Sequence, residues 1–542
     1  MLKIWTQYGD DLGGRKLKRL RRLESVRFRS AKAVSGLHET LCYLRAYPDD
    51  AQLLAQVERM LAGFHRRADL KRFAARLADS GIAGTETRFR FYAETAFWLA
   101  RHYPQQLLVD WAELSEKQKE LLFERLPLLA HYAATLGLDE APLTLRQWVK
   151  RMKAPGEGDG AFLARSFGAI DAGPFLKQAF FEEIDLPLRL RPAPGAPSRT
   201  HAKHRLPVHW QRGPLRSGRP DLREALRRPP GVRAASEREG RELIRLAREA
   251  MVTRARDLDV FAYADPRDVR LLDCGDGLVF AMIGFLPERR LLLEAVYGFL
   301  TLKNGVPIGY VLNSAFCGSA EVAYNVFETY RGGEAGHVYG WVLSCVRHLF
   351  GVDAFTIYPY QLGQDNDEAI ESGAWWFYQK FGFRPRDPGA LALMQRELEL
   401  MQRRPAHRSS RATLAKLAAH NMFYFLGPPR GEVMGEIPLG NIGLAVTDFL
   451  AKNGESDCAR KAARRLGLRS LAGWSRGERV AWARWAPLLL LIEGVERWSP
   501  TERRAAVAVV RAKGGRRESD YVALFDRHPK LRAALLALGN RA

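Results

Sequence analysis

The spacing of hydrophobic positions predicts helical regions on both sides of a central region of strands. Residues 1 to about 155 have a helical pattern, with amphipathic runs at Ala51–Phe64 and Lys119–Leu136. The chain from about residue 391 to its end is again mostly helical in pattern. A serine or threonine followed three residues later by Gln or Glu predicts helix starts at Ser115, Thr144, Ser475 and Ser499.

The central region changes to short strand patterns. Ala295–Lys303 and Val306–Leu312 are apolar runs joined by Asn304-Gly305. This dipeptide is typical of a two-residue hairpin turn, because both turn positions take positive φ. Upstream, Ser236 and Glu239 predict the start of a helix that runs toward Arg254.

The most informative stretch runs from Glu321 to Phe383. Glu321–Tyr330 is rich in aromatic and β-branched residues, which predicts a strand, and Asp353–Tyr358 predicts a second one. Between them, the glycine-rich turn Arg331–Gly336 precedes a run with the one-sided apolar spacing of a helix. Such a turn lets backbone N–H groups approach a ligand, and the helix dipole favours negative charge there. The pattern predicts a phosphate site.

A second helix is predicted to close this stretch. Its apolar spacing places one set of residues toward the core, namely Ile370, Ala374, Phe377 and Phe381. An adjacent flank is predicted to carry Glu371, Trp375 and Tyr378, so Tyr378 is expected to reach a cleft. An aromatic residue on a helix flank is more often a packing residue than a catalytic one.

The order of these elements resembles the acyl-CoA-binding core of the GNAT N-acyltransferase superfamily. The resemblance lies in the hairpin Lys303-Asn-Gly-Val-Pro-Ile-Gly-Tyr310, the turn Tyr330-Arg-Gly-Gly-Glu-Ala-Gly336, and the helix Ser372-Gly-Ala-Trp-Trp-Phe-Tyr-Gln-Lys-Phe-Gly-Phe383. It covers residues 236–390. It implies an α/β fold with a mixed sheet and helices on both faces, and acetyl-CoA or another acyl-CoA as co-substrate without a metal.

The resemblance also implies roles for individual residues. Tyr378 would protonate or hydrogen-bond the departing thiolate, and Glu321 is the expected base for the amine. A strand-edge glutamate is otherwise more often simply solvated. The expected cofactor-binding residues are Asn325, Val326, Phe327, Arg331, Gly332, Gly333 and Gly336.

Two features depart from the family pattern. Glu334 stands where the family has a glycine, and a carboxylate beside a pyrophosphate is unfavourable unless it points away. After Phe383 the composition of Ala390–Gln402 predicts a helix where the family has a strand, so the sheet is expected to end early. Met422–Leu426 is either a late strand after a helical insertion or a core segment of the next domain.

The length of 542 residues predicts several domains. We expect a helical domain at 1–186, a Pro- and Arg-rich linker at 187–235, a GNAT-like domain at 236–390 and a helical C-terminal domain at 391–542. The linker is poor in apolar periodicity, so it is expected to wrap the surface or to be disordered. No apolar run is long enough to span a bilayer and no targeting peptide is evident, so the expected location is the cytoplasm.

Net charge and cysteine content add little about partners. The formal net charge of +23 favours anionic partners in general, and Arg15–Arg22 is the densest basic run. The arginines are spread along the chain without a recognised nucleic-acid module, so nucleic acid is only weakly supported as a partner. Five dispersed cysteines favour reduced thiols over a disulfide framework or a zinc site.

Two functions of different class follow. The first is an enzyme that transfers an acyl group from acyl-CoA or a carrier thioester to an amine acceptor. The second is a catalytically degenerate GNAT-fold scaffold that binds an acidic partner such as RNA or a protein. Glu321, Tyr378 and the order of the elements favour the enzyme, whereas Glu334 and an early end of the sheet would favour the scaffold.

Overall fold

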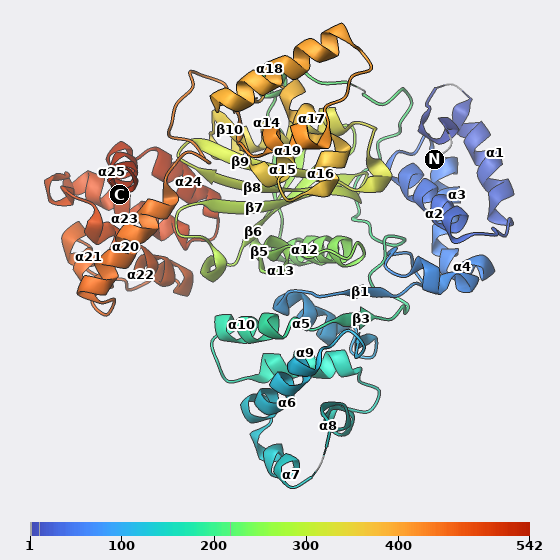
Figure 1. Ribbon diagram of the computed structural model, residues 1–542, viewed down its shortest axis with the longest axis horizontal. Coiled ribbons are helices and arrows are strands. Elements are labelled where there is room, and N and C mark those ends of the chain that lie inside the picture. The colour runs from blue at the N-terminus through green and yellow to red at the C-terminus, as the bar shows by residue number, and fades with distance from the viewer. Residues whose placement is uncertain (1–2, 10, 142, 217, 542) are drawn as a thin grey trace. The chain divides into compact units, whose positions relative to one another are not determined.

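The computed structural model describes residues 3–9, 11–141, 143–216 and 218–541. The chain forms two compact units, each built from several segments. The first unit contains Met1–Leu215, Arg241–Ala264 and Leu302–Ile308, and the second contains Arg216–Gly240, Asp265–Thr301 and Gly309–Ala542. Figure 1 shows the helices and strands of both units.

The first unit begins with short helices that pack through their apolar faces. Ser30 and Asp50 cap α2 and α3, because their side-chain oxygens accept hydrogen bonds from the first-turn N–H groups of Ala33 and Leu53. These helices are η1 (Lys3–Thr6), α1 (Leu12–Glu24), α2 (Ala31–Ala46), α3 (Ala51–Ala62), η2 (Phe64–Arg66), α4 (Ala68–Arg72) and η3 (Ala74–Leu77).

The rest of the first unit combines helices with a small sheet. Both predicted capping boxes, at Ser115 and Thr144, are confirmed. The helices are α5 (Ala93–His102), α6 (Glu116–Ala130), η4 (Tyr132–Ala134), α7 (Thr135–Asp139), α8 (Leu145–Met152), α9 (Asp159–Ala169) and α10 (Pro174–Ile184). Three strands lie in the order β1 (Thr87–Phe89), β3 (Leu188–Leu190), β2 (Leu107–Val109). The prediction of helix throughout was therefore wrong here, since three-residue strands are too short to show an alternating pattern.

The Pro- and Arg-rich segment 187–235 is more ordered than its composition suggests. Arg45 is buried and donates hydrogen bonds to the carbonyl oxygens of Thr200 (2.6 Å) and Arg199 (2.9 Å). The Thr200 hydroxyl in turn bonds His38 Nε2 at 2.9 Å. The segment also contains β3, α11 (Leu222–Ala225) and β4 (Gly231–Ala234). Its backbone is held by polar contacts with other segments, which a hydrophobic pattern does not reveal.

A large mixed sheet dominates the second unit. Its strand order is β11-β12-β10-β9-β8-β7-β6-β5-β4. The strands after β4 are β5 (Ala264–Asp273), β6 (Leu278–Phe285), β7 (Ala295–Lys303), β8 (Val306–Phe316), β9 (Ser319–Val326), β10 (Ala354–Ile357), β11 (Arg384–Pro385) and β12 (Met422–Phe425). The predicted hairpin is confirmed: Asn304 and Gly305 connect β7 to β8 with φ values of 50° and 79°. The chain thus has a mixed α/β architecture.

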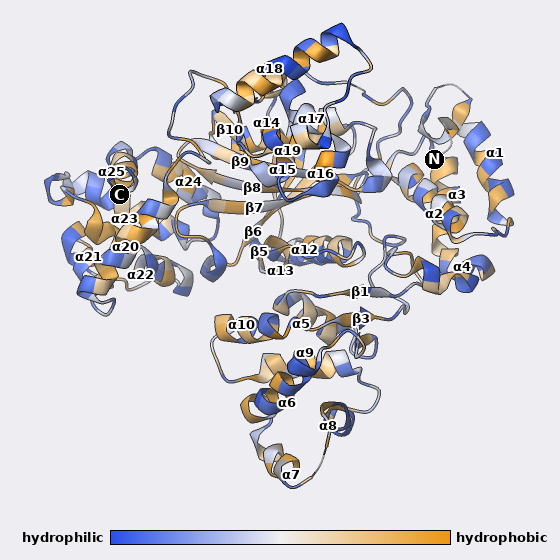
Figure 2. Cartoon of the chain, viewed as in Figure 1, coloured by the Kyte–Doolittle hydropathy of each residue, from blue (hydrophilic) through white to orange (hydrophobic). Residues whose placement is uncertain are grey.

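The sheet does not end early, and that expectation was wrong. β12 returns after a helical insertion and pairs antiparallel with β10, from Ala354 opposite Phe425 to Ile357 opposite Met422. It also pairs with β11. The insertion consists of α18 (Pro388–Arg403) and α19 (Arg411–Ala418). Figure 2 shows hydrophobic and hydrophilic patches alternating along α18, as expected for an amphipathic helix. The strand alternative for Met422–Leu426 is confirmed, and the sheet extends past both ends of the expected range 236–390.

The remaining helices of the second unit are mostly C-terminal. The capping boxes at Ser475 and Ser499 are confirmed, and Trp482 and Trp485 are fully buried packing residues. The C-terminal helices are α20 (Leu439–Asn453), α21 (Cys458–Leu466), α22 (Arg476–Leu491), η7 (Val495–Arg497), α23 (Pro500–Lys513), α24 (Glu518–Asp526) and α25 (Pro529–Gly539). η5 (Pro287–Arg289) lies earlier in the second unit. α13 (Asp259–Ala262) belongs to the first unit, and α12 (Glu237–Val252), whose start Ser236 caps, lies mostly in the first unit.

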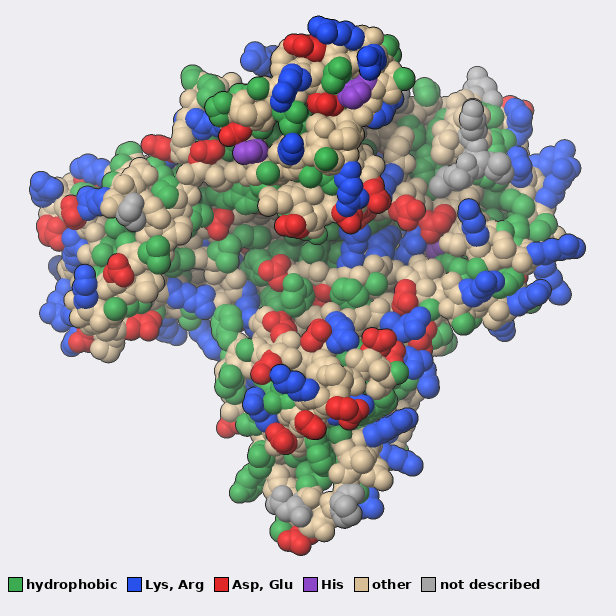
Figure 3. All heavy atoms as spheres, viewed as in Figure 1, with side chains coloured by type: hydrophobic (Ala, Val, Ile, Leu, Met, Phe, Trp, Pro, Cys, Tyr) green, Lys and Arg blue, Asp and Glu red, His purple; other side chains and the backbone are tan. Residues whose placement is uncertain are grey.

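Surface charge is widely distributed. Figure 3 shows Lys and Arg side chains on both the N-terminal and the C-terminal helices, and no single basic patch stands out on the face shown. Among the described residues, no helix is both long and apolar enough to cross a membrane.

Candidate functional site

The candidate site lies where two neighbouring parallel strands separate. β9 and β10 pair in parallel only from Ser319 to Glu321, whereas β9 continues to Val326 and stays paired with β8 on its other edge. The connection between them contains η6 (Glu328–Tyr330), the glycine-rich turn at residues 331–334 and α14 (Ala335–Phe350). The predicted helix is confirmed, whereas the predicted strand Glu321–Tyr330 was wrong beyond Val326, because residues 328–330 form a 3-10 turn. A crevice at the carboxyl ends of such strands is where open α/β sheets bind ligands.

A cavity of about 290 Å³ opens at this separation. One wall is the end of β9 and the turn before α14. The other is formed by α15 (Pro359–Leu362), α16 (Asp367–Ser372) and α17 (Ala374–Lys380). Five of the residues predicted from the sequence line it together: Asn325, Val326, Arg331, Gly332 and Tyr378. Segments that are far apart in the chain therefore meet at one site.

The other predicted cofactor residues do not line the cavity. Phe327 is buried with its ring 6.1 Å from that of Tyr310, and Gly333 lies outside the lining. Gly336 faces a different segment, since a Cβ atom there would lie 2.6 Å from the carbonyl oxygen of Gly218. Gly336 thus permits close packing of the chain against α14. Fewer residues of the glycine-rich turn line the cavity than the sequence predicted.

The carboxylate of Glu334 is turned away from the cavity lining. Glu334 is buried, and its Oε1 accepts a hydrogen bond from the backbone N–H of Arg216 at 3.3 Å. The residue does not line the cavity. The departure from the family pattern at this position therefore places no charge in the cavity wall.

Polar groups around the turn have defined partners, with one exception. Arg331 donates from Nε to the carbonyl oxygen of Val326 at 3.1 Å and forms an ion pair with Glu368, which also lines the cavity. Asn325 Oδ1 is a buried oxygen with no hydrogen-bond partner within the described part of the chain. An unsatisfied buried acceptor in a cavity wall is suited to a ligand that donates a hydrogen bond, such as an amide N–H.

Tyr378 is both a packing residue and a cavity residue. Its ring lies 5.5 Å from that of Tyr339 and 6.0 Å from that of Phe383. Burial raises the pKa of its phenol, and the charge of Glu321 raises it further, while a hydrogen bond with the backbone of Tyr324 opposes this. The phenol is therefore protonated at neutral pH and can act as a proton donor.

Glu321 lies deeper, outside the cavity lining. It stands opposite Ser314 on β8 and Thr356 on β10, at the last pair before the strands separate. Burial, and then the charge of Glu294, raise the pKa of Glu321 to about 8. A carboxyl group with such a pKa exchanges its proton near neutral pH, as a general base must.

The helix that carries Tyr378 is broken, contrary to the prediction. Gly373 has a φ of 68° and separates α16 from α17. The predicted flank therefore does not continue across it: Trp375 is fully buried, and its indole N–H donates to the carbonyl oxygen of Leu417 at 3.2 Å. The break also brings residues that were not predicted into the cavity wall, namely Gln361, Asn366, Glu368, Ala369 and Ser372. The glycine at 373 was the only sequence signal for this.

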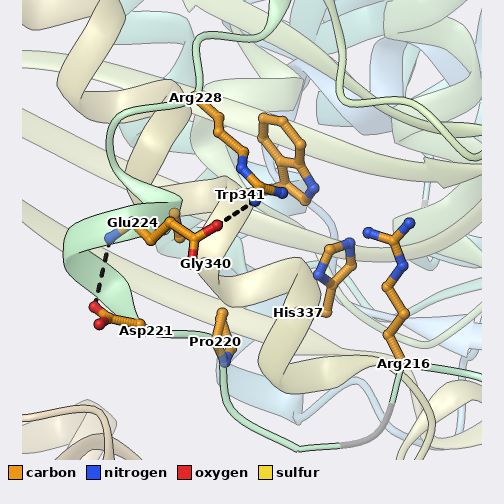
Figure 4. Close-up of a pocket in the computed structure, with 9 residues that line it drawn as sticks. Arg216, Pro220, Asp221, Glu224, Arg228, His337, Gly340 and Trp341 are labelled. Carbon is orange, nitrogen blue, oxygen red and sulfur yellow. Dashed lines mark hydrogen bonds and ion pairs between the residues drawn. The ribbon is translucent and has the colours of Figure 1, made fainter.

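A second, smaller hollow of about 170 Å³ lies where α11 packs on α14. Figure 4 shows Glu224 reaching Arg228 and Asp221 capping α11, with His337 and Trp341 on the facing helix. Arg216 forms an ion pair of 2.7 Å with Asp276. A Cβ atom at Gly340 would lie 2.9 Å from Pro220 Cγ, so this glycine allows Pro220 to pack closely against α14.

Comparison with protein-family models, curated proteins and solved structures finds no match. The functional interpretation therefore depends on the residues and geometry of this chain.

Proposed function

We propose that the protein is an N-acyltransferase that moves an acyl group from acyl-CoA, or from a carrier-bound thioester, to an amine acceptor. The observation that carries the proposal is the meeting of Asn325, Val326, Arg331, Gly332 and Tyr378 in one cavity at the separation of β9 and β10. The resemblance of the hairpin, turn and helix sequences to GNAT enzymes supports the proposal of a GNAT-like fold for residues 231–425.

The cavity residues suit an extended, partly anionic thioester ligand. Gly332 has a φ of 80° and open space on its side-chain side, so the backbone there is accessible to a phosphate group. Asn325 and the end of β9 offer hydrogen-bonding groups to an amide-containing arm. When bound, the co-substrate supplies the activated acyl group.

The chain supplies the proton transfers in this proposal. The ionised form of Glu321 accepts the proton of the attacking amine, directly or through water; with a pKa of about 8 this form is the minority at pH 7 and increases as the pH rises. Tyr378 keeps its proton at that pH and donates it, or a hydrogen bond, to the departing thiolate. The charge of Glu321 acts on the pKa of Tyr378, so the two groups are electrostatic neighbours.

A catalytically degenerate scaffold is the second candidate. One observation favours it: the cation expected to bind pyrophosphate, Arg331, already forms an ion pair with Glu368 in the cavity wall. A scaffold of this kind would bind an acidic partner such as RNA or a protein through the many exposed cations of its helices.

Thermal unfolding with and without ligand separates the two functions. Acetyl-CoA, a longer acyl-CoA and free CoA are expected to raise the melting temperature, because each binds only the folded protein. Arg331→Glu should abolish the increase, since it places a carboxylate at the phosphate position. Arg347→Glu, in the last turn of α14 and outside the cavity lining, is the matched control. No increase with any of the three ligands would contradict the enzyme.

Turnover of Tyr378→Phe tests the chemical role. The variant keeps the ring that packs on Tyr339 but lacks the phenol proton. We expect turnover to fall by about 10- to 1000-fold while the ligand-induced increase in melting temperature remains. Loss of both would show that Tyr378 is a structural residue.

A further inference from the structure

Three side chains of the C-terminal helices bind three successive backbone carbonyls immediately before β7. Trp485 Nε1 on α22 donates to the oxygen of Leu292 at 2.9 Å. The Tyr521 hydroxyl on α24 donates to Leu293 at 2.6 Å, and Lys513 Nζ on α23 donates to Glu294 at 2.7 Å. Three different helices therefore fix the backbone of residues 292–294.

The donors are themselves held rigidly. Lys513 is buried and forms a 2.6 Å ion pair with Glu518, which is fully buried. The backbone N–H of Glu518 donates to Asp268 Oδ2 at 3.1 Å, and Arg290 donates to the carbonyl oxygen of Lys513 at 2.8 Å. Buried and paired groups of this kind allow little movement, because any displacement leaves a charge unpaired.

The fixed segment directs a carboxylate toward Glu321. Ser314 Oγ donates to Glu294 Oε1 at 3.2 Å, and Ser314 stands directly opposite Glu321 across β8 and β9. Directly opposite residues on one face of an antiparallel pair have Cβ atoms about 5 Å apart. The charge of Glu294 acts on Glu321, and both carboxylates act on Tyr358. Glu294 and Glu321 are therefore neighbours.

We propose that Glu294 is a positioning and electrostatic partner of Glu321 in the reaction, and that the C-terminal helices hold it in place. The inference rests on the proposed acyl transfer, in which Glu321 accepts the amine proton. Two neighbouring carboxylates resist carrying two negative charges, so a negative charge on Glu294 makes Glu321 a stronger base. This gives the C-terminal helices a role in the chemistry although none of their residues lines the cavity.

The test replaces Glu294 with Gln, which still accepts the Ser314 hydrogen bond but carries no charge. The charged and titratable groups around the pair are Lys513 and the phenol of Tyr521 near Glu294, and the phenols of Tyr339, Tyr358 and Tyr378 near Glu321. None of these is changed by the substitution. We expect the acid limb of the pH profile of kcat/KM to move to lower pH, because the pKa of Glu321 falls. Glu288→Gln, which removes a carboxylate from the same connection before β7, should leave the limb unchanged.

A second readout does not depend on acyl transfer. The carboxyl carbon resonance of Glu321, in protein with ¹³C-labelled glutamate and assigned with Glu321→Gln, reports its titration midpoint without substrate. The midpoint should fall in Glu294→Gln and stay unchanged in Glu288→Gln. An unchanged midpoint in Glu294→Gln would overturn the inference. A lowered midpoint in a protein that transfers no acyl group would refute the proposed function while leaving the carboxylate pair in place.

The helices are tested with Tyr521→Phe, which keeps the ring but removes the hydrogen bond to Leu293. Without this hydrogen bond the backbone of residues 292–294 is held less firmly, so Glu294 is less well positioned. The titration midpoint of Glu321 should therefore fall, as in Glu294→Gln, but by a smaller amount. Trp498→Phe, a change at a buried residue between η7 and α23, should lower the melting temperature without moving the midpoint. If both variants leave the midpoint unchanged, the C-terminal helices do not position Glu294.

Discussion

Replacing Gly336 with Ala distinguishes a packing glycine from a phosphate-binding glycine. The new Cβ atom would lie 2.6 Å from the carbonyl oxygen of Gly218 and 3.4 Å from Cζ of Phe381, where ordinary contacts begin at 3.4 Å. The backbone near Gly218 must therefore move by about 0.8 Å, or the helix must shift. Overpacking of this kind costs about 1 to 3 kcal/mol.

A smaller effect of opposite sign reduces this cost. Alanine is a better helix former than glycine by about 0.5 to 1 kcal/mol, because glycine loses more backbone entropy on folding. Gly336 is the second residue of α14. The stabilisation by alanine, which is measured in helix interiors, is therefore an upper limit at this position. The expected net loss of unfolding free energy for Gly336→Ala is about 0.5 to 2 kcal/mol.

Urea denaturation of the ligand-free protein measures this difference. The matched control is Gly443→Ala in the interior of α20, where an added Cβ would meet nothing within 4 Å. That variant should gain about 0.5 to 1 kcal/mol. A Gly336→Ala protein that is as stable as Gly443→Ala but no longer responds to acyl-CoA would refute the packing interpretation and restore Gly336 to the cofactor site.

Two further predictions concern stability. The pKa of Glu321 is about 8 in the folded chain, higher than its ordinary value of 4.5. Proton binding by Glu321 therefore contributes to the free energy of unfolding in full below pH 4.5, and this contribution is lost as the pH rises to about 8. Glu321→Gln should therefore be more stable than the parent protein at pH 9, by about 2 kcal/mol after allowance for partial solvent contact. At about pH 5 the two proteins should be nearly equal in stability. A difference in unfolding free energy that stays constant with pH in chemical denaturation would contradict this. Ser475→Ala removes a capping box whose serine accepts from the N–H of Glu478 at 3.2 Å, so it should lower unfolding free energy by about 1 kcal/mol. Ser456→Ala, in the exposed turn between α20 and α21, should cost less than half as much, and equal losses would show that the cap is not the cause.

Local signals in the sequence were enough to predict the elements around the candidate site. The Asn304-Gly305 turn, the aromatic and β-branched composition of β9 and the one-sided apolar spacing of α14 are each local signals. The three elements are confirmed, although β9 ends at Val326 and not at Tyr330. The capping boxes are confirmed for the same reason, since the serine or threonine and its partner are three residues apart. Five of the nine predicted site residues line one cavity because β9 and α17 were correctly placed.

The errors arise where distant segments decide the structure. Gly336 looks like part of a phosphate cradle until Gly218, more than a hundred positions earlier, is placed against it. Trp375 was expected on a flank adjacent to the core stripe, because the helical period was carried across Gly373, where the chain takes a left-handed conformation. Glu294 was not predicted at all, since its relation to Glu321 depends on the pairing of β8 with β9 and on helices near the C-terminus.

The features that favoured a scaffold over an enzyme can now be weighed individually. The sheet is completed by β12, so the wall beyond β10 is present. Glu334 binds the backbone of Arg216 and does not line the cavity. The pair of Arg331 with Glu368 remains, but both side chains are about half exposed, and exposed pairs contribute about 0 to 1 kcal/mol. A phosphate group could replace the Glu368 carboxylate at that small cost, because its charge is larger and guanidinium binds phosphate in a bidentate manner. The balance therefore favours the enzyme, with Arg331 available to an anionic ligand.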